Sequence, residues 1–309
     1  MGPIRELIHK SSSAAEYYNF DDRPGKIFSG IEHCRSTIVI ATKGSGTVTA
    51  ITSKYHRWYT EDRPSLFSNL CSVRVSLQSP EDIIPKIGTE IEKSILEKIR
   101  KQSVSKKLGD FAVKDGEKVW YHNAPQYWIH AHLEGYVPSV EYYESYRQDK
   151  ETGKIILGKL KEANNSDHYK YVEFSKELAP IVTALLNSTF FYWLFVAYSD
   201  GRDLLPQRIL SIPVNMSSIS REAEEKLSML ALELMHDYDK NSNVKINIRK
   251  GGYAIRIREI IPKLSYNIIK KIDAEISTIF SLSKEELEFI ENFDLEFRLG
   301  KSEDTELAQ

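Results

Sequence analysis

The first eighty residues carry short hydrophobic patterns that are typical of β-strands. A β-branched run at 36–42, STIVIAT, predicts one strand, and a second strand at roughly 47–52 would form a hairpin with it across a turn at 43–47. The segment DDRPG at 21–25 is predicted to turn, because Pro24 fixes φ and Gly25 permits a positive φ. Further elements predicted here are the end of a helix at 4–9 and strands at 14–20 and 71–77.

After residue 79 the hydrophobic period changes to that of a helix. Ile87, Ile91, Ile95 and Ile99 recur every four residues, which predicts a helix with one apolar stripe over 79–99. Helices dominate the C-terminal third, whereas strands dominate the first eighty residues. The whole pattern therefore predicts a mixed α/β fold. The elements predicted in this part are strands at 154–158 and 169–174 and helices at 221–238, 264–280 and 284–293.

One segment has almost the composition of a membrane span. Residues 181–198, IVTALLNSTFFYWLFVAY, contain only four polar side chains. A spanning helix needs about 20 apolar residues, and here an Asn-Ser-Thr cluster lies near the middle of the segment. The prediction is therefore a buried helix of a protein core, without a membrane partner.

Composition and charge narrow the class of protein. The 309 residues are 41% hydrophobic and 28% charged, which is a globular composition with a sizeable core. A net charge of −2 excludes a uniformly basic nucleic-acid binder but leaves room for a local basic patch. Two cysteines, Cys34 and Cys71, cannot build a disulfide framework, and the charged N-terminus lacks the apolar core of a signal peptide. These features predict a cytoplasmic protein.

The charge is uneven along the C-terminal third. From Lys245 to Lys271 there are eight basic residues and one acid, Glu259, whereas the chain from Ile272 onward holds eleven acids and three bases. Such asymmetry is typical of an anion-binding face, although a solvated surface produces the same pattern.

Motifs that carry chemistry are scarce. There is no G-x-G-x-x-G loop, and His122, His130 and His132 lack the spacing of metal ligands. Glu224-Glu225-Lys226 is a carboxylate-lysine sequence of nuclease type, but it lies on a predicted amphipathic helix with no Pro-Asp partner upstream. No catalytic, cofactor-binding or metal-ligating residue is therefore predicted.

A resemblance to a known family rests on seven segments that occur in order. They are FDDRPGKIFSGIEHCRSTIVIAT (20–42), TSKYHRWYTEDRPSLF (52–67), KIGTEIEKSIL (86–96), YHNAPQYWIHA (121–131), HYKYVEF (168–174), ALLNSTFFYWLFVAYSDGRDL (184–204) and PKLSYNIIKKIDAEISTIFSLSKEELEFIENFDLEFRLGK (262–301). This succession resembles the C-terminal half of adenine-N6 DNA methyltransferases of bacterial restriction–modification systems, in the branch of the large Taq-like and type IIG enzymes.

The resemblance implies an incomplete enzyme. Enzymes of this family hold S-adenosylmethionine in a glycine-rich loop and grip the flipped adenine with an (N/D)PP(Y/F) motif, and neither is present here. It implies that residues 1–78 supply the terminal strands of a Rossmann-like methyltransferase sheet. Residues 79–309 would form an α+β target-recognition domain with helical C-terminal support. The expected partners are double-stranded DNA and an upstream half that carries S-adenosylmethionine, and the chain alone is predicted to be inactive.

The candidate DNA contacts are basic or amide side chains, since cations bind phosphates and amides pair with adenine edges. Each has a structural alternative, such as an ion pair or a capped turn. The candidates are Arg23 in the turn at 21–25, Arg57 and Arg63, the amides Asn123 and Gln126, Arg202 after the apolar helix, and Arg249, Lys250, Arg256 and Arg258 around Gly251-Gly252.

Two other interpretations stay open. The chain could be a free-standing nuclease component of a restriction system, or a decayed fragment that folds without a partner. An upstream reading frame that encodes the missing motifs would favour the methyltransferase interpretation, whereas metal-dependent cleavage by the purified chain would favour the nuclease.

Overall fold

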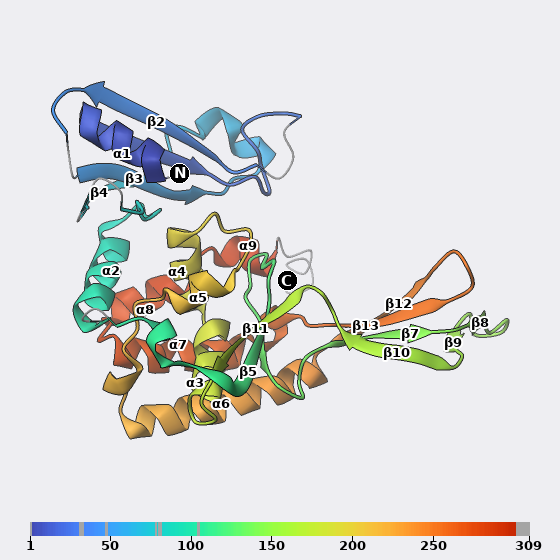
Figure 1. The fold of residues 1–309 in the computed structure, drawn as a ribbon. Helices are drawn as coiled ribbons and strands as arrows, with labels where there is room; N and C mark the ends of the chain where they lie inside the picture. The colour runs from blue at the N-terminus through green and yellow to red at the C-terminus, as the bar shows by residue number, and fades with distance from the viewer. Residues whose placement is uncertain are drawn as a thin grey trace, which may run out of the picture. The chain divides into compact units, whose positions relative to one another are not determined.

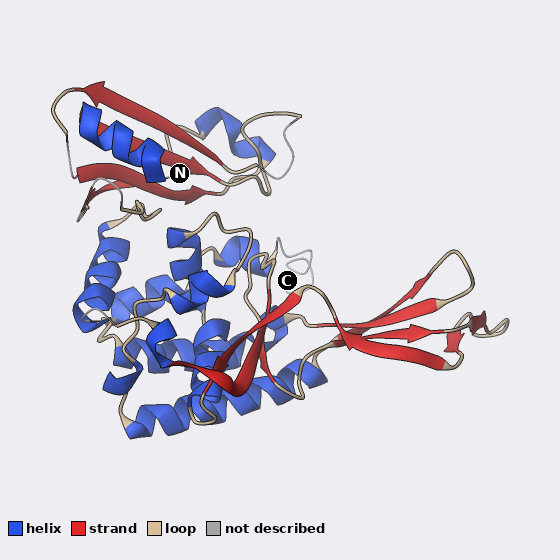
Figure 2. Ribbon diagram, in the orientation of Figure 1, coloured by secondary structure: helices blue, strands red, loops and turns tan. Residues whose placement is uncertain are grey.

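The computed structural model describes residues 2–30, 34–46, 49–77, 79, 82–103 and 106–300. The turn predicted at 43–47 and the start of the strand predicted at 47–52 lie partly outside these residues. In the described part the chain forms nine α-helices and thirteen β-strands, which confirms the predicted mixture of α and β (Figures 1 and 2).

Residue contacts divide the chain into two compact units. The first comprises Met1–Gln102, Trp193–Gly201 and Lys284–Phe289, and the second comprises Ser103–Tyr192, Arg202–Ser283 and Ile290–Gln309. The domain boundary at residue 78, which the family resemblance implied, stays a prediction.

The first unit contains a four-stranded sheet preceded by α1 (Gly2–Ser11). Its strands are β1 (Ser12–Phe20), β2 (Ser36–Lys43), β3 (Thr49–His56) and β4 (Ser72–Ser76), in the order β2-β1-β3-β4. β1 runs parallel to β3, and the other pairs are antiparallel. The predicted hairpin between the second and third strands is therefore wrong, because β1 lies between them. β1 and β3 bury alternate side chains, whereas β2 is exposed along most of its length, so the two better-buried strands take the centre of the sheet.

The helix predicted over 79–99 begins later than its periodicity suggests. It is α2 (Glu90–Ser103), and Ile87 is fully buried ahead of it. Pro85 disfavours helical backbone at the residue before it. The carboxylate of Glu92 then accepts hydrogen bonds from the backbone N–H of Gly88 (2.7 Å) and Thr89 (3.1 Å), which satisfies donors at the helix start.

The long apolar segment forms two helices instead of one. α3 (Leu178–Asn187) and α4 (Thr189–Tyr198) meet at a bend of 70°. Ser188 at the bend is extended, and the Asn187 amide donates to the backbone oxygens of Ala131 (2.9 Å) and Thr183 (2.8 Å). The prediction that this segment is buried is confirmed. No single helix in the described part is long and apolar enough to cross a membrane, although the bent pair meets that test by length and composition.

The helical part of the second unit packs around α3. The predicted amphipathic helix is α6 (Arg221–Lys240), and its leucines Leu227, Leu230 and Leu234 are buried. The other helices of this unit are α5 (Pro206–Leu210), α7 (Tyr266–Ile279) and α9 (Leu295–Leu299), whereas most of α8 (Lys284–Glu291) belongs to the first unit.

A three-stranded sheet covers this helical part. It consists of β5 (Ala112–His122), β6 (Ala131–Leu133) and β11 (Tyr169–Phe174), in the order β11-β5-β6. Val119, Tyr121, Ala131 and Val172 are buried on the face that contacts α3.

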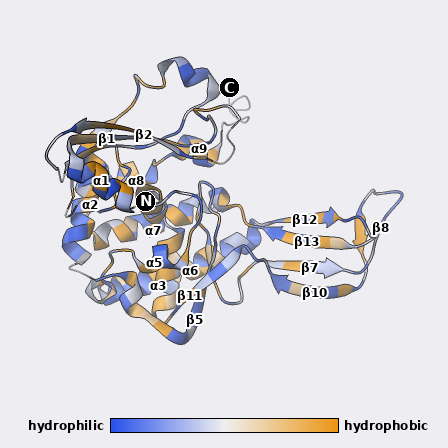
Figure 3. Cartoon of the chain, turned by 45° about the horizontal axis from the view of Figure 1, so that its top comes forward, coloured by the Kyte–Doolittle hydropathy of each residue, from blue (hydrophilic) through white to orange (hydrophobic). Residues whose placement is uncertain are grey.

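A second sheet of the same unit forms an arm. Its strands are β7 (Ser139–Tyr143), β10 (Leu160–Asn165), β12 (Asn243–Ile248) and β13 (Ala254–Glu259), in the order β10-β7-β13-β12. The short pair β8 (Tyr146–Gln148) and β9 (Ile155–Leu157) lies beyond β7 along the chain. Figures 1 and 2 show the arm extending from the helices of this unit, and Figure 3 shows hydrophobic and hydrophilic residues mixed along it. Every residue of β10 is exposed and every residue of β7 is half-buried, so the arm has little core of its own.

Candidate nucleic-acid interface

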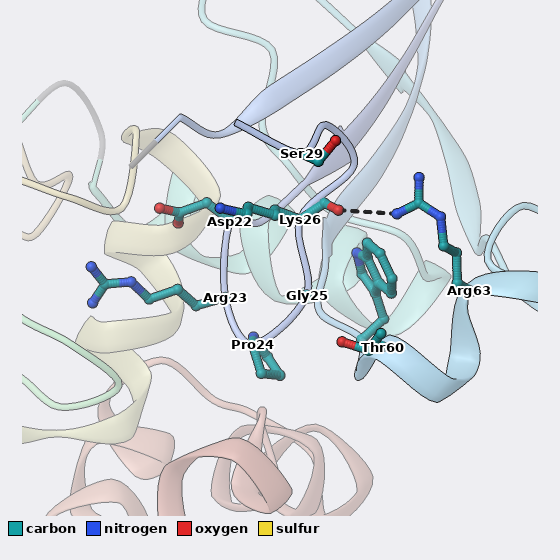
Figure 4. A pocket seen from close by; sticks show the side chains of 9 residues that line it. Asp22, Arg23, Pro24, Gly25, Lys26, Ser29, Thr60 and Arg63 are labelled. Atoms are coloured by element: carbon teal, nitrogen blue, oxygen red, sulfur yellow. Dashed lines mark hydrogen bonds between the residues drawn. The ribbon is translucent and has the colours of Figure 1, made fainter. Parts of the chain in front are cut away.

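Two candidate arginines of the first unit line one surface pocket. The pocket has a volume of about 530 Å³, and Arg23 and Arg63 line it together with Lys26, Trp58 and Thr60. Arg63 donates to the backbone oxygens of Lys26 (3.2 Å) and Ile27 (2.9 Å), and its guanidinium lies 5.6 Å from the Trp58 ring centroid. Figure 4 shows Arg23 and Arg63 extending to opposite sides of the loop that holds Pro24. The structure thus brings the two residues to one pocket without directing them at one another.

Gly25 shapes this pocket through close packing. Its backbone N–H donates to the Trp58 carbonyl oxygen (2.8 Å), and a Cβ at this position would lie 2.7 Å from that oxygen and 2.8 Å from the indole ring. Gly25 permits a positive φ, but its backbone does not adopt one. The residue is required for space instead. Lys26 and Ser29 also line the pocket and were not predicted as candidates, although their place in the same polar turn is a usable signal.

Arg57 is buried in an ion pair. Its Nε atom lies 2.7 Å from Oδ2 of Asp21, and the side chains of Arg57 and Asp21 are only 4% and 2% exposed. Arg35 Nε lies 2.8 Å from the other carboxylate oxygen of Asp21. This placement does not support a DNA contact by Arg57, since its guanidinium neutralises a carboxylate inside the first unit.

The two candidate amides differ in their surroundings. Gln126 is exposed, next to Tyr127, which has a positive φ of 65°. Asn123 is half-buried, and its Oδ1 atom has no hydrogen-bond partner among the described residues. Trp128, close to both amides in the sequence, is a core residue: it is 8% exposed, and the Arg298 guanidinium lies 3.8 Å from its ring centroid.

A glycine lies just after the end of the apolar helix. Gly201 has a φ of +67°, and its N–H donates to the Ser199 hydroxyl oxygen (2.8 Å). The Arg35 guanidinium donates to the carbonyl oxygen of Asp200 (2.8 Å), and a Cβ at Gly201 would lie 3.5 Å from its Cζ atom. Arg202, the candidate that follows, has an exposed side chain.

The basic candidates around Gly251-Gly252 lie on a β-hairpin. β12 and β13 pair antiparallel, and both glycines have positive φ, at 112° and 80°. Arg249 and Lys250 are exposed at its tip.

The other two basic candidates of the hairpin are engaged in ion pairs. Arg256 pairs with Glu141 on β7 (3.1 Å), and Arg258 pairs with Asp239 at the end of α6. Lys245, the fifth basic residue of the hairpin, pairs with Glu259 (2.6 Å), so only Arg249 and Lys250 at the tip make no ion pair with the described residues.

His122, His130 and His132, whose spacing in the sequence is not that of metal ligands, lie close together at the three-stranded sheet. His130 Nδ1 lies 3.1 Å from His132 Nε2, and His122 stacks on His130 and His168. Burial lowers the pKa of His132 to about 3 and lowers that of His130 well below its usual value, so both rings are neutral near pH 7. No group of three His, Cys, Asp or Glu side chains in the described part is arranged to hold a metal ion.

An aromatic group on this sheet was not predicted as a candidate. Trp120 and Tyr171 are direct cross-strand partners with ring centroids 4.8 Å apart, and Lys118 Nζ lies 4.9 Å from the Tyr171 ring. The alternation of Lys118, Trp120 and His122 along one strand is the pattern that could have revealed it.

Comparisons with known proteins add no relative. No protein-family model matches the chain, and a search of curated proteins found no match.

Proposed function

We propose that the chain is the DNA-recognition part of an adenine-N6 DNA methyltransferase. In this proposal the arm of the second unit contacts double-stranded DNA, and a separate methyltransferase half supplies S-adenosylmethionine and the adenine pocket. The terminal strands of a Rossmann-like sheet correspond to β1–β4, and the target-recognition domain corresponds to most of the second unit.

The observation that carries the proposal is the exposed arm with its basic tip. The major groove of B-DNA is about 12 Å wide and admits a two-stranded β-ribbon. The β12–β13 hairpin at the edge of the arm has this form. Between Asn243 and Glu259 the arm holds five basic residues against one acid. Arg249 and Lys250 are exposed at the turn, where backbone phosphates would be met first.

The mixed sheet of the first unit agrees with the same interpretation. Its central pair, β1 and β3, is parallel and both edge strands are antiparallel, and mixed sheets of this kind are common in α/β proteins. The family resemblance of the sequence supplies the adenine-N6 chemistry, and the arm supports only the DNA contact.

Duplex binding by the purified chain tests the proposal. The measurement is fluorescence anisotropy of labelled duplexes across a salt series, for the wild type and for Arg249→Gln/Lys250→Gln. The double variant should bind every duplex more weakly, and the slope of log K against log salt should fall by about 0.9 for each phosphate that the variant no longer neutralises.

A matched control removes the same charge elsewhere. Lys106→Gln/Lys107→Gln changes two exposed lysines of the same unit outside the arm and should leave the slope unchanged. Absence of duplex binding by the wild type would refute the proposal, and metal-dependent cleavage would favour the nuclease alternative.

A further inference from the structure

We propose that Arg256 and Arg258 read two guanines separated by one base pair, with Glu141 and Asp239 as the residues that position them. The inference rests on the proposed function, since it assigns base readout to the arm that is proposed to contact DNA.

The two arginines lie on one face of the arm. They are two residues apart in β13, and successive side chains of a strand point to opposite faces, so both project from the same side. Ile246 and Val244 are their direct partners on β12 and share this face. The side chains of both arginines are 42% exposed, so a ligand can reach their guanidinium groups.

Each guanidinium is held by an acid from another element. Glu141 is the cross-strand partner of Arg256 on β7 and accepts from its Nη1 atom at 3.1 Å. The Tyr143 hydroxyl donates to the same carboxylate at 2.5 Å, so three side chains of two strands form one hydrogen-bonded group. Asp239 accepts from Nη1 of Arg258 in the same manner.

These ion pairs stabilise the fold little but orient the arginines. Exposed pairs contribute roughly 0–1 kcal/mol to stability, and Glu141 and Asp239 are 23% and 42% exposed. An oriented side chain loses less rotamer freedom on binding than a mobile one. A guanidinium carries five N–H donors, so one that is held at Nη1 keeps donors for a bidentate contact to guanine O6 and N7.

The spacing of the arginines matches the spacing of base pairs. A strand rises about 3.4 Å per residue, so side chains two residues apart are separated by roughly 7 Å. Base pairs of B-DNA are stacked about 3.4 Å apart along each strand, so this separation spans two steps. With β13 running along the groove, the arginines therefore meet guanines at positions n and n+2.

Selection from a random duplex library with the whole purified chain tests the inference. The wild type should enrich sites with two G·C pairs separated by one base pair. Arg256→Lys keeps the charge but loses the fork, and it should reduce the preference for guanine at one of these positions by about tenfold or more. Arg258→Lys should do the same at the other position and leave the first unchanged.

The positioning role has its own readout. Glu141→Gln keeps the size of the side chain, and it should reduce the preference for guanine at the Arg256 position without changing the salt slope. The control Lys250→Gln should weaken binding to all duplexes equally and reduce the slope. A melting curve for each variant verifies that the arm is folded.

The outcomes separate the inference from the proposed function. Duplex binding without guanines at n and n+2, or lysine variants with unchanged base preference, would overturn the readout by Arg256 and Arg258 while DNA recognition by the arm stands. A wild-type chain that binds no duplex would overturn both.

Discussion

Arg57 and Asp21 form an ion pair that is almost fully buried, with Nε and Oδ2 2.7 Å apart. Burial alone would raise the pKa of the Asp21 carboxyl, but the guanidinium groups of Arg57 and Arg35 outweigh it, so the pKa is lowered. The ion pair thus gives Arg57 a structural role, although Arg57 lies in a polar segment of the sequence.

Replacing Arg57 by Ala is expected to destabilise the first unit by about 3–5 kcal/mol, since it leaves a buried carboxylate with less compensation. Chemical denaturation measures this change. Arg74→Ala removes an exposed arginine from the same unit, and its effect should stay within about 0.5 kcal/mol. Equal effects of the two substitutions would contradict the structural role of Arg57.

The same pair predicts a dependence on acid. Because the folded-state pKa of Asp21 is below its ordinary value of 3.8, its contribution to stability is present above that pH and is lost as the pH falls through the folded-state pKa. The difference in stability between the wild type and Asp21→Asn should therefore be constant from pH 7 to pH 5 and shrink toward pH 3.

The buried carboxyl of Asp273, in the second unit, should change stability with pH in the opposite direction. Burial raises the pKa of Asp273 to about 7, although its Oδ1 atom accepts from the backbone N–H of Phe190 at 3.0 Å. A raised folded-state pKa gives stability that is fully present below pH 3.8 and is lost as the pH rises through 7. A tenfold change in proton affinity corresponds to about 1.36 kcal/mol, so the loss is at most roughly 4 kcal/mol.

Asp273→Asn should remove this dependence. The melting temperature of the variant is expected to fall less between pH 5 and pH 8 than that of the wild type, while both have the same α-helix content by circular dichroism. If the two profiles are parallel, the Asp273 carboxyl does not change its ionisation in this range.

Periodicity predicted most helices of the second unit but little of the strand order. Leu227, Leu230 and Leu234 mark the buried face of α6, because their spacing follows the helical period. By contrast, the parallel pairing of β1 with β3 depends on which strands are buried. The local sequence of β2, STIVIAT, does not indicate that β2 is an edge strand.

The ion pairs of the candidate DNA-contact residues could not be predicted, because their partners are distant in the sequence. Arg256 and Glu141 are 115 positions apart, and Arg57 and Asp21 are 36 apart, so neither ion pair has a local signal. The hairpin around Gly251-Gly252 was predictable because its turn residues and alternating strands are contiguous.

Arg202 stays a candidate for base readout outside the arm. If Arg202 binds a guanine edge, Arg202→Ala should weaken binding to the preferred site by about 1–3 kcal/mol. Its effect on the affinity for other duplexes should be small. Anisotropy titrations with the selected site and a scrambled duplex measure this difference. A uniform loss would indicate a phosphate contact, and a lower melting temperature with unchanged preference would indicate a structural role.

The proposed division of labour predicts no methyl transfer by the chain alone. Neither a glycine-rich cofactor loop nor an (N/D)PP(Y/F) motif occurs in the sequence, and methylation of a base in a duplex requires both a cofactor site and a pocket for the flipped base. Calorimetry with S-adenosylmethionine should therefore show no binding. Micromolar binding of S-adenosylmethionine by the isolated chain would contradict this prediction and would favour an enzyme that is active without a partner.

The exposed edge of the first sheet predicts self-association of the isolated chain. β2 is an edge strand in which Val39 and Ile40 are 41% and 54% exposed, and as neighbours they project from opposite faces. An edge strand with β-branched side chains and no internal charge is a template for pairing with another strand. Light scattering should detect dimers or larger species at micromolar concentration, and Ile40→Lys should reduce them. Met229→Lys, at a 71% exposed position on α6, adds the same charge and should not reduce them. If the separate methyltransferase half of the proposed function pairs with the β2 edge, co-expression with that half should also suppress self-association. A monomeric wild-type chain would show that β2 is protected without a partner.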